Sequence, residues 1–151
     1  MDFEGLVDIR YYPDDPGLSG FTEHINGKTF EVIKGETMTG DVYMKKLGIS
    51  NIGLLKIDVE GGEQKVLKGF SQALDQQLID VIQFEYGTVN ITTRYLLADY
   101  YRWLGSKGYE IGKIFPNHVA FKEYEYVDEN FLGPNFLAVK KSRKDLINKL
   151  S

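Results

Sequence analysis

Hydrophobic and polar residues alternate, or give way to short apolar runs, in several stretches of the chain, and these stretches predict β-strands. Residues 53–59 and 78–86 are the clearest, because they are rich in branched aliphatic and aromatic side chains. The strands we expect are 6–12, 30–34, 53–59, 78–86, 109–115 and 135–140, with a further strand within 118–126.

The longest predicted helix follows the strand at 78–86, where apolar residues recur every three or four positions. We expect Thr92 or Thr93 to open it, because threonine is a good N-terminal cap. The dipeptide Lys107-Gly108 is expected to end it. One face of this helix would carry Leu96, Leu97, Tyr100, Trp103 and Leu104.

Shorter helices are predicted before and after the strand at 53–59. Thr37 or Thr39 is suited to cap a helix that runs to residue 47, where Gly48 can adopt the left-handed conformation that ends many helices. A second helix is expected over 63–68, and Ser71 is suited to cap a third.

This alternation of strands and helices predicts one α/β domain over 1–151, with a sheet that is parallel at first and closed by an antiparallel strand. Residues 1–36 are expected to be an irregular or short-strand lead-in to a core over 37–140. The basic residues near the end indicate a solvated tail over 141–151.

Composition narrows the classes of function. The net charge is −4 and no basic stripe is present, so we expect no nucleic-acid binding. No apolar run is long enough to span a membrane, and the first residues are unlike a signal peptide, so we expect a cytoplasmic protein that does not bind membranes. Without cysteine and with only two histidines, we expect neither a thiolate zinc site nor a histidine-rich metal site, and we assign no metal ligands.

The stretch 54–70 (LLKIDVEGGEQKVLKGF) places Lys56, Asp58 and Glu60 at alternate positions of an otherwise apolar strand, just before two glycines. Glu85 ends the next strand. In open α/β sheets, ligands bind beyond the carboxyl ends of the strands, so we expect the three carboxylates to converge there. Such a cluster can act as a base, bind a cation or orient a polar ligand.

A purely structural interpretation explains the same residues. Lys56 and Asp58 can form an ion pair along the strand, Glu63 favours the positive end of the following helix, and Gly61-Gly62 can form a tight turn.

The residues of this stretch also resemble a known family. The run LKIDVEGGE at 55–63, followed by VLKG at 66–69, closely resembles the hallmark segment of FkbM-type methyltransferases, which are similar to class I S-adenosylmethionine-dependent enzymes. The resemblance extends over about 30–140. It includes TGD at 39–41, IQFE at 82–85 and NFLAV at 135–139.

The resemblance implies methyl transfer from S-adenosylmethionine to a hydroxyl of a sugar or a secondary metabolite. It places Asp58 near the methyl-donating end of the cofactor, with Gly61 as a further cofactor-binding residue. Asp58, Glu60 and Glu85 are the implied catalytic candidates. Lys56 and His118 are weaker candidates on the acceptor side, and Lys56 is better suited to pair with a carboxylate.

One part of the family pattern is missing. Class I enzymes carry a glycine-rich cofactor loop after their first strand and a ribose-binding acid after their second. The best candidates here, 14–20 and Glu36, fail because 20–30 leaves no room for a crossover helix. We therefore expect only the C-terminal half of the Rossmann-like class I sheet, its strands four to seven.

Such a half would bind S-adenosylmethionine weakly or not at all. It would leave a strand edge open to self-association or to a partner chain that completes the sheet. The chain would then be a truncated enzyme or one half of a split enzyme. The alternative is a non-catalytic interaction module that uses this edge and aromatics such as Tyr124 and Tyr126.

Overall fold

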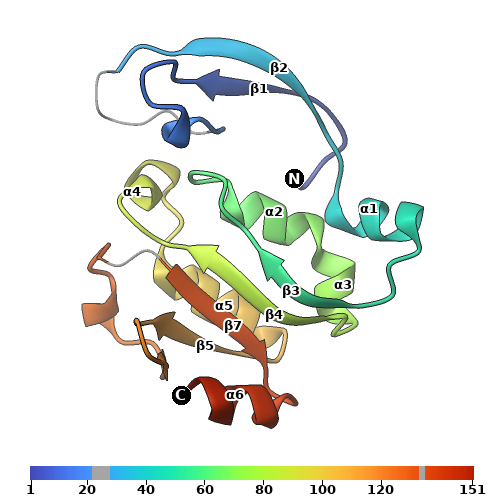
Figure 1. The fold of residues 1–151 in the computed structure, drawn as a ribbon, viewed down its shortest axis with the longest axis vertical. Coiled ribbons are helices and arrows are strands. Elements are labelled where there is room, and N and C mark those ends of the chain that lie inside the picture. Colours follow the sequence, from blue (N-terminus) through green and yellow to red (C-terminus); the bar gives the residue numbers. More distant parts are fainter. Residues whose placement is uncertain (22–27, 133–134) are drawn as a thin grey trace.

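The computed structural model describes residues 1–21, 28–132 and 135–151, which form a five-stranded sheet with helices and a separate two-stranded ribbon (Figure 1). The strand order of the large sheet is β3-β4-β7-β5-β6. These strands are β3 (Ile52–Lys56), β4 (Ile79–Glu85), β5 (Tyr109–Ile114), β6 (Val119–Phe121) and β7 (Asn135–Lys140). The chain thus has the predicted strands at 53–59, 78–86, 109–115 and 135–140, although β3 ends earlier than expected.

The strand directions confirm the predicted mixed sheet. β3 and β4 are parallel, whereas β7 lies antiparallel between β4 and β5. Because β7 runs against both of its neighbours, β3, β4 and β5 all point in one direction. Their carboxyl ends therefore lie at the same edge of the sheet.

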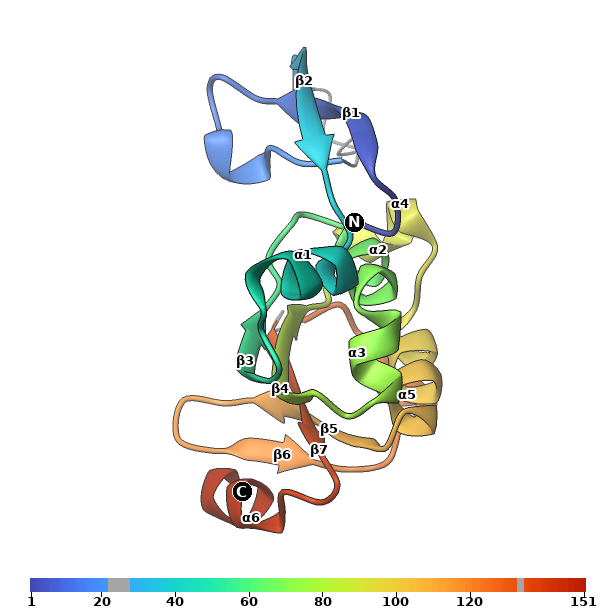
Figure 2. The same ribbon diagram turned by 90° about the vertical axis from the view of Figure 1, so that its right-hand side faces the viewer.

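The two faces of the sheet are covered unequally. Along β7, Phe136 and Ala138 belong to the main core, whereas Leu137 and Val139 belong to a smaller cluster on the other face. The main core packs against α1 (Gly40–Leu47), α2 (Glu63–Gly69), α3 (Ser71–Asp75) and α5 (Leu97–Ser106). The smaller cluster packs against α6 (Lys144–Leu150), which lies at the far end of the molecule from the ribbon (Figure 2).

The ribbon consists of β1 (Gly5–Tyr11) and β2 (Glu31–Thr37), paired antiparallel over their whole length. It stands apart from the large sheet (Figures 1 and 2). Its apolar side chains are poorly covered, since Leu6 is 69% exposed and Val32 is 56% exposed. The lead-in is therefore a regular two-stranded structure in its described part.

The predicted start of α1 is confirmed. The Thr39 hydroxyl accepts a hydrogen bond from the Val42 amide, and Gly48 ends the helix in the left-handed region with φ 65°. The predicted cap of α3 is wrong, because Ser71 is the first helical residue. The carboxylate of Asp41 on α1 instead accepts hydrogen bonds from two amides in the first turn of α3.

The predicted start of the longest helix is also wrong. Thr92 and Thr93 end a separate short helix, α4 (Val89–Thr93), and Arg94 then adopts a left-handed conformation with φ 56°. α5 begins at Leu97, where the amides of Leu97 and Ala98 donate to the carboxylate of Glu129. This cap lies far along the chain, so local sequence cannot reveal it.

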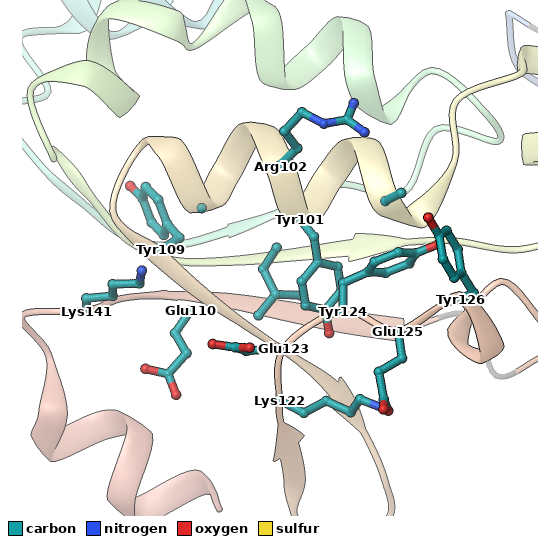
Figure 3. A pocket seen from close by; sticks show the side chains of 13 residues that line it. Tyr101, Arg102, Tyr109, Glu110, Lys122, Glu123, Tyr124, Glu125, Tyr126 and Lys141 are labelled. Atoms are coloured by element: carbon teal, nitrogen blue, oxygen red, sulfur yellow. The ribbon is translucent and has the colours of Figure 1, made fainter.

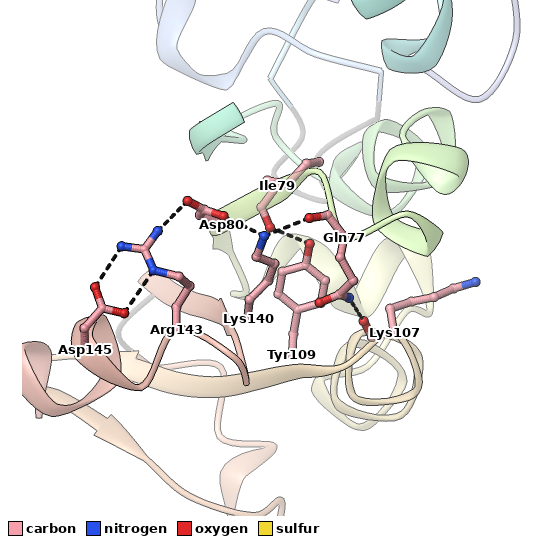
Figure 4. Close-up of polar contacts among 8 residues, drawn as sticks. All are labelled: Gln77, Ile79, Asp80, Lys107, Tyr109, Lys140, Arg143 and Asp145. Carbon is pink, nitrogen blue, oxygen red and sulfur yellow. Dashed lines mark hydrogen bonds and ion pairs between the residues drawn. The ribbon is translucent and has the colours of Figure 1, made fainter. Parts of the chain in front are cut away.

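The expected basic tail folds onto the sheet as α6, with Ile147 buried. Asp80 on β4 holds this region in place (Figure 4). Its carboxylate pairs with Lys140 Nζ at 2.7 Å and with Arg143 at 2.5 Å. Arg143 also pairs with Asp145. The basic side chains in this segment therefore have a structural role in addition to solvation.

In the described ranges, no helix combines the length and the apolar character that crossing a membrane requires.

Candidate functional site

The loop after β3 holds the predicted site residues in an unusual backbone conformation. β3 ends at Lys56, so Asp58 and Glu60 lie in the loop and not in the strand as predicted. Glu60 has φ 49° and Gly61 has φ 92°, both in the left-handed region. That conformation costs little for glycine but is uncommon for glutamate, and such strain often accompanies function.

Glu63, the first residue of α2, stabilises this loop. Its carboxylate oxygen Oε1 accepts hydrogen bonds from the Val59 amide at 3.2 Å and the Gly61 amide at 3.3 Å. The residue is only 1% exposed, and its second oxygen has no hydrogen-bond partner among the residues that the structure describes. Glu63 therefore fixes the backbone on both sides of Glu60.

The three predicted carboxylates meet at the sheet edge. Asp58, Glu60 and Glu85 each offer an oxygen atom, and these atoms all lie within 4.8 Å of one another. Glu85 comes from the end of β4, which pairs with β3 in parallel register. The expected convergence of these residues is therefore confirmed, while their catalytic roles stay a prediction.

Lys56 supplies a positive charge at the rim of this cluster. Its ammonium group lies 2.5 Å from a carboxylate oxygen of Asp58, in an exposed ion pair. The prediction that Lys56 pairs with a carboxylate is confirmed. Carboxylate oxygens at such spacing also suit a hard divalent cation, but the lysine already neutralises part of the charge that would attract one.

The electrostatics of the cluster favour protonation of two of its members. Burial raises the pKa of Glu60, and the nearby charges of Glu85 and Asp58 raise it further. Burial also raises the pKa of Glu85, with additional effects from Asp58 and Glu63. The hydrogen bond from Lys56 to Asp58 raises the pKa of the lysine and keeps it charged.

The N-terminal region packs directly against the loop. Gly20 pairs with Arg10 of β1, and a methyl group placed at Gly20 would lie 3.0 Å from Cβ of Glu60. A methyl group placed at Gly62 would likewise lie 3.0 Å from the ring of Phe21. The segment that leaves the ribbon therefore covers one side of the acidic loop, and residue 20 must be small to allow this contact.

His118 is not brought into the cluster. It lies in the turn between β5 and β6, where its exposed ring stacks on Phe115 at a centroid distance of 5.1 Å. Among the described residues, Asp58, Glu60 and Glu85 form the single group of three or more suitable side chains that can surround an ion. The acceptor-side role predicted for His118 is untested.

The family model of the methyltransferase FkbM domain matches residues 10–111. The chain belongs to the FkbM methyltransferase family. The match contains the acidic loop, α2 and all of β4, so the carboxylate cluster lies within the family's own domain. Searches among curated proteins and among solved structures found no match.

Glu63 shapes the site of this FkbM methyltransferase domain, although the sequence pattern does not single it out as a site residue. Its position at the start of a helix is explained equally well by a favourable interaction with the helix dipole. The sequence signal is an acid directly after two glycines, because its carboxylate can accept hydrogen bonds from the amides of the preceding turn.

Proposed function

We propose that this chain provides the acceptor side of an S-adenosylmethionine-dependent O-methyltransferase that acts on a hydroxyl of a sugar or secondary metabolite. The observation that supports this most is the meeting of Asp58, Glu60 and Glu85 at the carboxyl edge of the sheet, within the matched family domain. Methylating a hydroxyl requires that its proton be removed, and carboxylates at this position can accept it.

The raised pKa values suggest a division of roles within the cluster. Glu60 and Glu85 are better matched to take a proton near neutral pH than an ordinary carboxylate would be. Asp58, paired with Lys56, is suited to orient the hydroxyl by accepting a hydrogen bond from it. Glu63 holds the loop in the shape that this arrangement needs.

The strand order supports the proposal that this is the C-terminal half of a class I sheet. A reversed strand, β7, between β4 and β5 is the arrangement expected for the last strand of that fold. The described residues before β3 form the antiparallel ribbon and α1, and none of them adds a parallel strand to the large sheet.

The chain therefore fits the cofactor only in part. The carboxyl edge offers residues for its reacting end, but the described elements before β3 include no parallel strand followed by a glycine-rich loop and a helix that would hold the adenosine. We propose that another segment, in a longer chain or a partner, pairs with the free edge of β3. An exposed and largely apolar strand such as β3 suits this role, since Leu54 is 59% exposed.

Calorimetry with S-adenosylhomocysteine tests the partial cofactor site. We expect the 151-residue chain alone to give no binding at micromolar concentration. Micromolar binding that is lost in Asp58→Asn would show a complete cofactor site and would overturn the proposal of a half site.

Transfer of a labelled methyl group tests the catalytic role. Purified chain is added to an extract of its source cells that lack the gene, together with S-adenosylmethionine tritiated in the methyl group. The extract supplies the partner segment that the chain needs to hold the cofactor. We expect the completed assembly to add tritium to base-stable methyl ethers, and Glu85→Gln to reduce this by about 100-fold. The matched control is Glu36→Gln, an exposed carboxylate on β2. Label that does not depend on the chain, or that is base-labile, would contradict O-methylation.

The exposed edge of β3 also supports a second function, that of a non-catalytic module that docks on a partner through this strand. The two functions make different predictions. A module would keep its partner when all three carboxylates are replaced by amides, and methyl transfer in the extract would not change.

A further inference from the structure

A large groove lies away from the carboxylate cluster, between α5, the start of β5 and the segment after β6 (Figure 3). Its volume is about 990 Å³, at the upper end of the range for small-molecule sites. None of the three site carboxylates lines it. The methyltransferase proposal therefore leaves this groove without a role.

Tyrosine rings dominate one wall of the groove. The ring centroids of Tyr101 and Tyr124 lie 5.7 Å apart, and Tyr124 contacts Tyr126 edge to face at 6.1 Å. Tyr126 lines the groove and is 91% exposed. A large ring left open to solvent at the mouth of a cavity provides a flat apolar surface for a ligand.

The charges around the groove largely neutralise one another. Lys122 pairs with Glu125 at 2.6 Å and with Asp128 at 3.1 Å. Arg102 pairs with Asp99 at 2.9 Å. Among the described lining residues, the charges left outside these pairs and the pair of Glu110 with Lys144 are Lys141 and Glu123, which are opposite in sign. No cluster of one sign therefore remains to attract a phosphate or a cationic ligand. The electrostatics therefore favour a neutral ligand.

Hydrogen-bond acceptors face the same space as the rings. Glu110 on β5 and Glu123 after β6 both line the groove (Figure 3). The carboxylate of Glu110 also pairs with Lys144 of α6 at 3.3 Å. Within the described residues Glu123 has neither an ion-pair nor a hydrogen-bond partner. Carboxylates accept hydrogen bonds but cannot donate them when ionised, so the ligand must bring hydroxyl or amide donors.

From this combination we propose that the groove binds a neutral oligosaccharide. Sugar rings present apolar C–H faces that can lie on Tyr126 and Tyr124, and hydroxyl groups that can donate to Glu110 and Glu123. The volume admits more than one sugar ring. A proline-rich peptide would also lie on aromatic rings, but its proline side chains offer no donors to the carboxylates. The site is separate from the carboxylate cluster and does not depend on methyl transfer.

Amide NMR shifts of the 151-residue chain test the proposal, with maltotetraose, cellotetraose and the tetramer of N-acetylglucosamine as probes. We expect at least one of them, at millimolar concentration, to shift the amides of Gly105, Glu123 and Tyr126. Tyr126→Ala and Glu123→Gln should each weaken binding about fivefold or more. The matched control Tyr43→Ala, an exposed tyrosine on α1, should leave it unchanged.

Asp58→Asn separates this proposal from the methyltransferase proposal, because it should abolish methyl transfer but leave oligosaccharide binding intact. The groove proposal would be overturned if no probe shifted these amides. It would also be overturned if neither groove variant weakened binding, or if a proline-rich peptide bound there in preference to every oligosaccharide.

Discussion

The centre of the sheet and its β3 end differ in how they are buried. β4 and β7 are covered on both faces, with Ile82, Phe84 and Val139 essentially inaccessible to solvent. β3 pairs in parallel with β4 and has a similarly apolar sequence, yet Leu54 is 59% exposed and the strand has one free edge. The stable centre thus serves as a scaffold, while the charged residues gather where burial is incomplete.

The largest loss of stability is expected when a large side chain is removed from the centre of the sheet. Phe84 is fully buried and stacks on Tyr100 and Phe136. We expect Phe84→Ala to lower the free energy of unfolding by about 3–5 kcal/mol, because it leaves a cavity. The matched variant Leu54→Ala should cost only about 0.5 kcal/mol. Urea denaturation measures both, and equal losses would show that β3 is buried like the centre.

The next largest effect is expected at Glu129, which joins the loop after β6 to the start of α5. Its carboxylate accepts the amides of Leu97 and Ala98 and the hydroxyls of Tyr86 and Tyr124. Glu129→Gln should cost about 1–3 kcal/mol, because it removes charge and acceptors from a half-buried network.

Glu125→Gln, on an exposed residue of the same segment, is the control for this measurement. If both variants lower the denaturation midpoint equally, the buried hydrogen bonds of Glu129 contribute no more stability than the exposed carboxylate of Glu125.

The charged edge should respond to pH in the opposite sense to most carboxylates. The pKa values of Glu60 and Glu85 are raised in the folded chain, so the folded state favours their protonated forms. Their contribution to stability is full below the ordinary pKa of glutamate and is lost as the pH rises through the raised values.

The double variant Glu60→Gln/Glu85→Gln should therefore raise Tm at pH 7 by about 1–2 °C after allowance for solvent screening. The gain should disappear below about pH 4, where both carboxyls are protonated in the folded and the unfolded chain. Thermal scans across this pH range measure it. A lower Tm for the double variant at pH 7 would contradict the crowding of charge.

The smallest effect on stability is expected at Lys56. Its ion pair with Asp58 is exposed, so Lys56→Met should leave the urea denaturation midpoint nearly unchanged. The lysine charge lowers the pKa of Glu85, however, and its loss should raise that pKa further. Carboxyl NMR shifts detect this change. An unchanged pKa of Glu85 would show that the lysine charge does not act on the cluster.

Sequence predicted the parts of this molecule that depend on local pattern. Strand identity, the Thr39 cap and the convergence of Asp58, Glu60 and Glu85 all follow from short-range spacing and from the direction of parallel strands. The start of α5 and the role of Glu129 could not be predicted, because the capping carboxylate lies about thirty positions away. α6 was missed because its charged residues obscure a short apolar face around Ile147.

The most direct test of the central claim, that three carboxylates from two segments share one site, is an NMR titration of the carboxyl groups of Glu60 and Glu85 in Asp58→Asn. The sample contains a chelator, so that no cation obscures the result. Asp58 raises the pKa of both glutamates. We therefore predict that both pKa values fall in the variant. If both stay as in the unmodified chain, the three side chains do not form one cluster, and the proposed site is wrong.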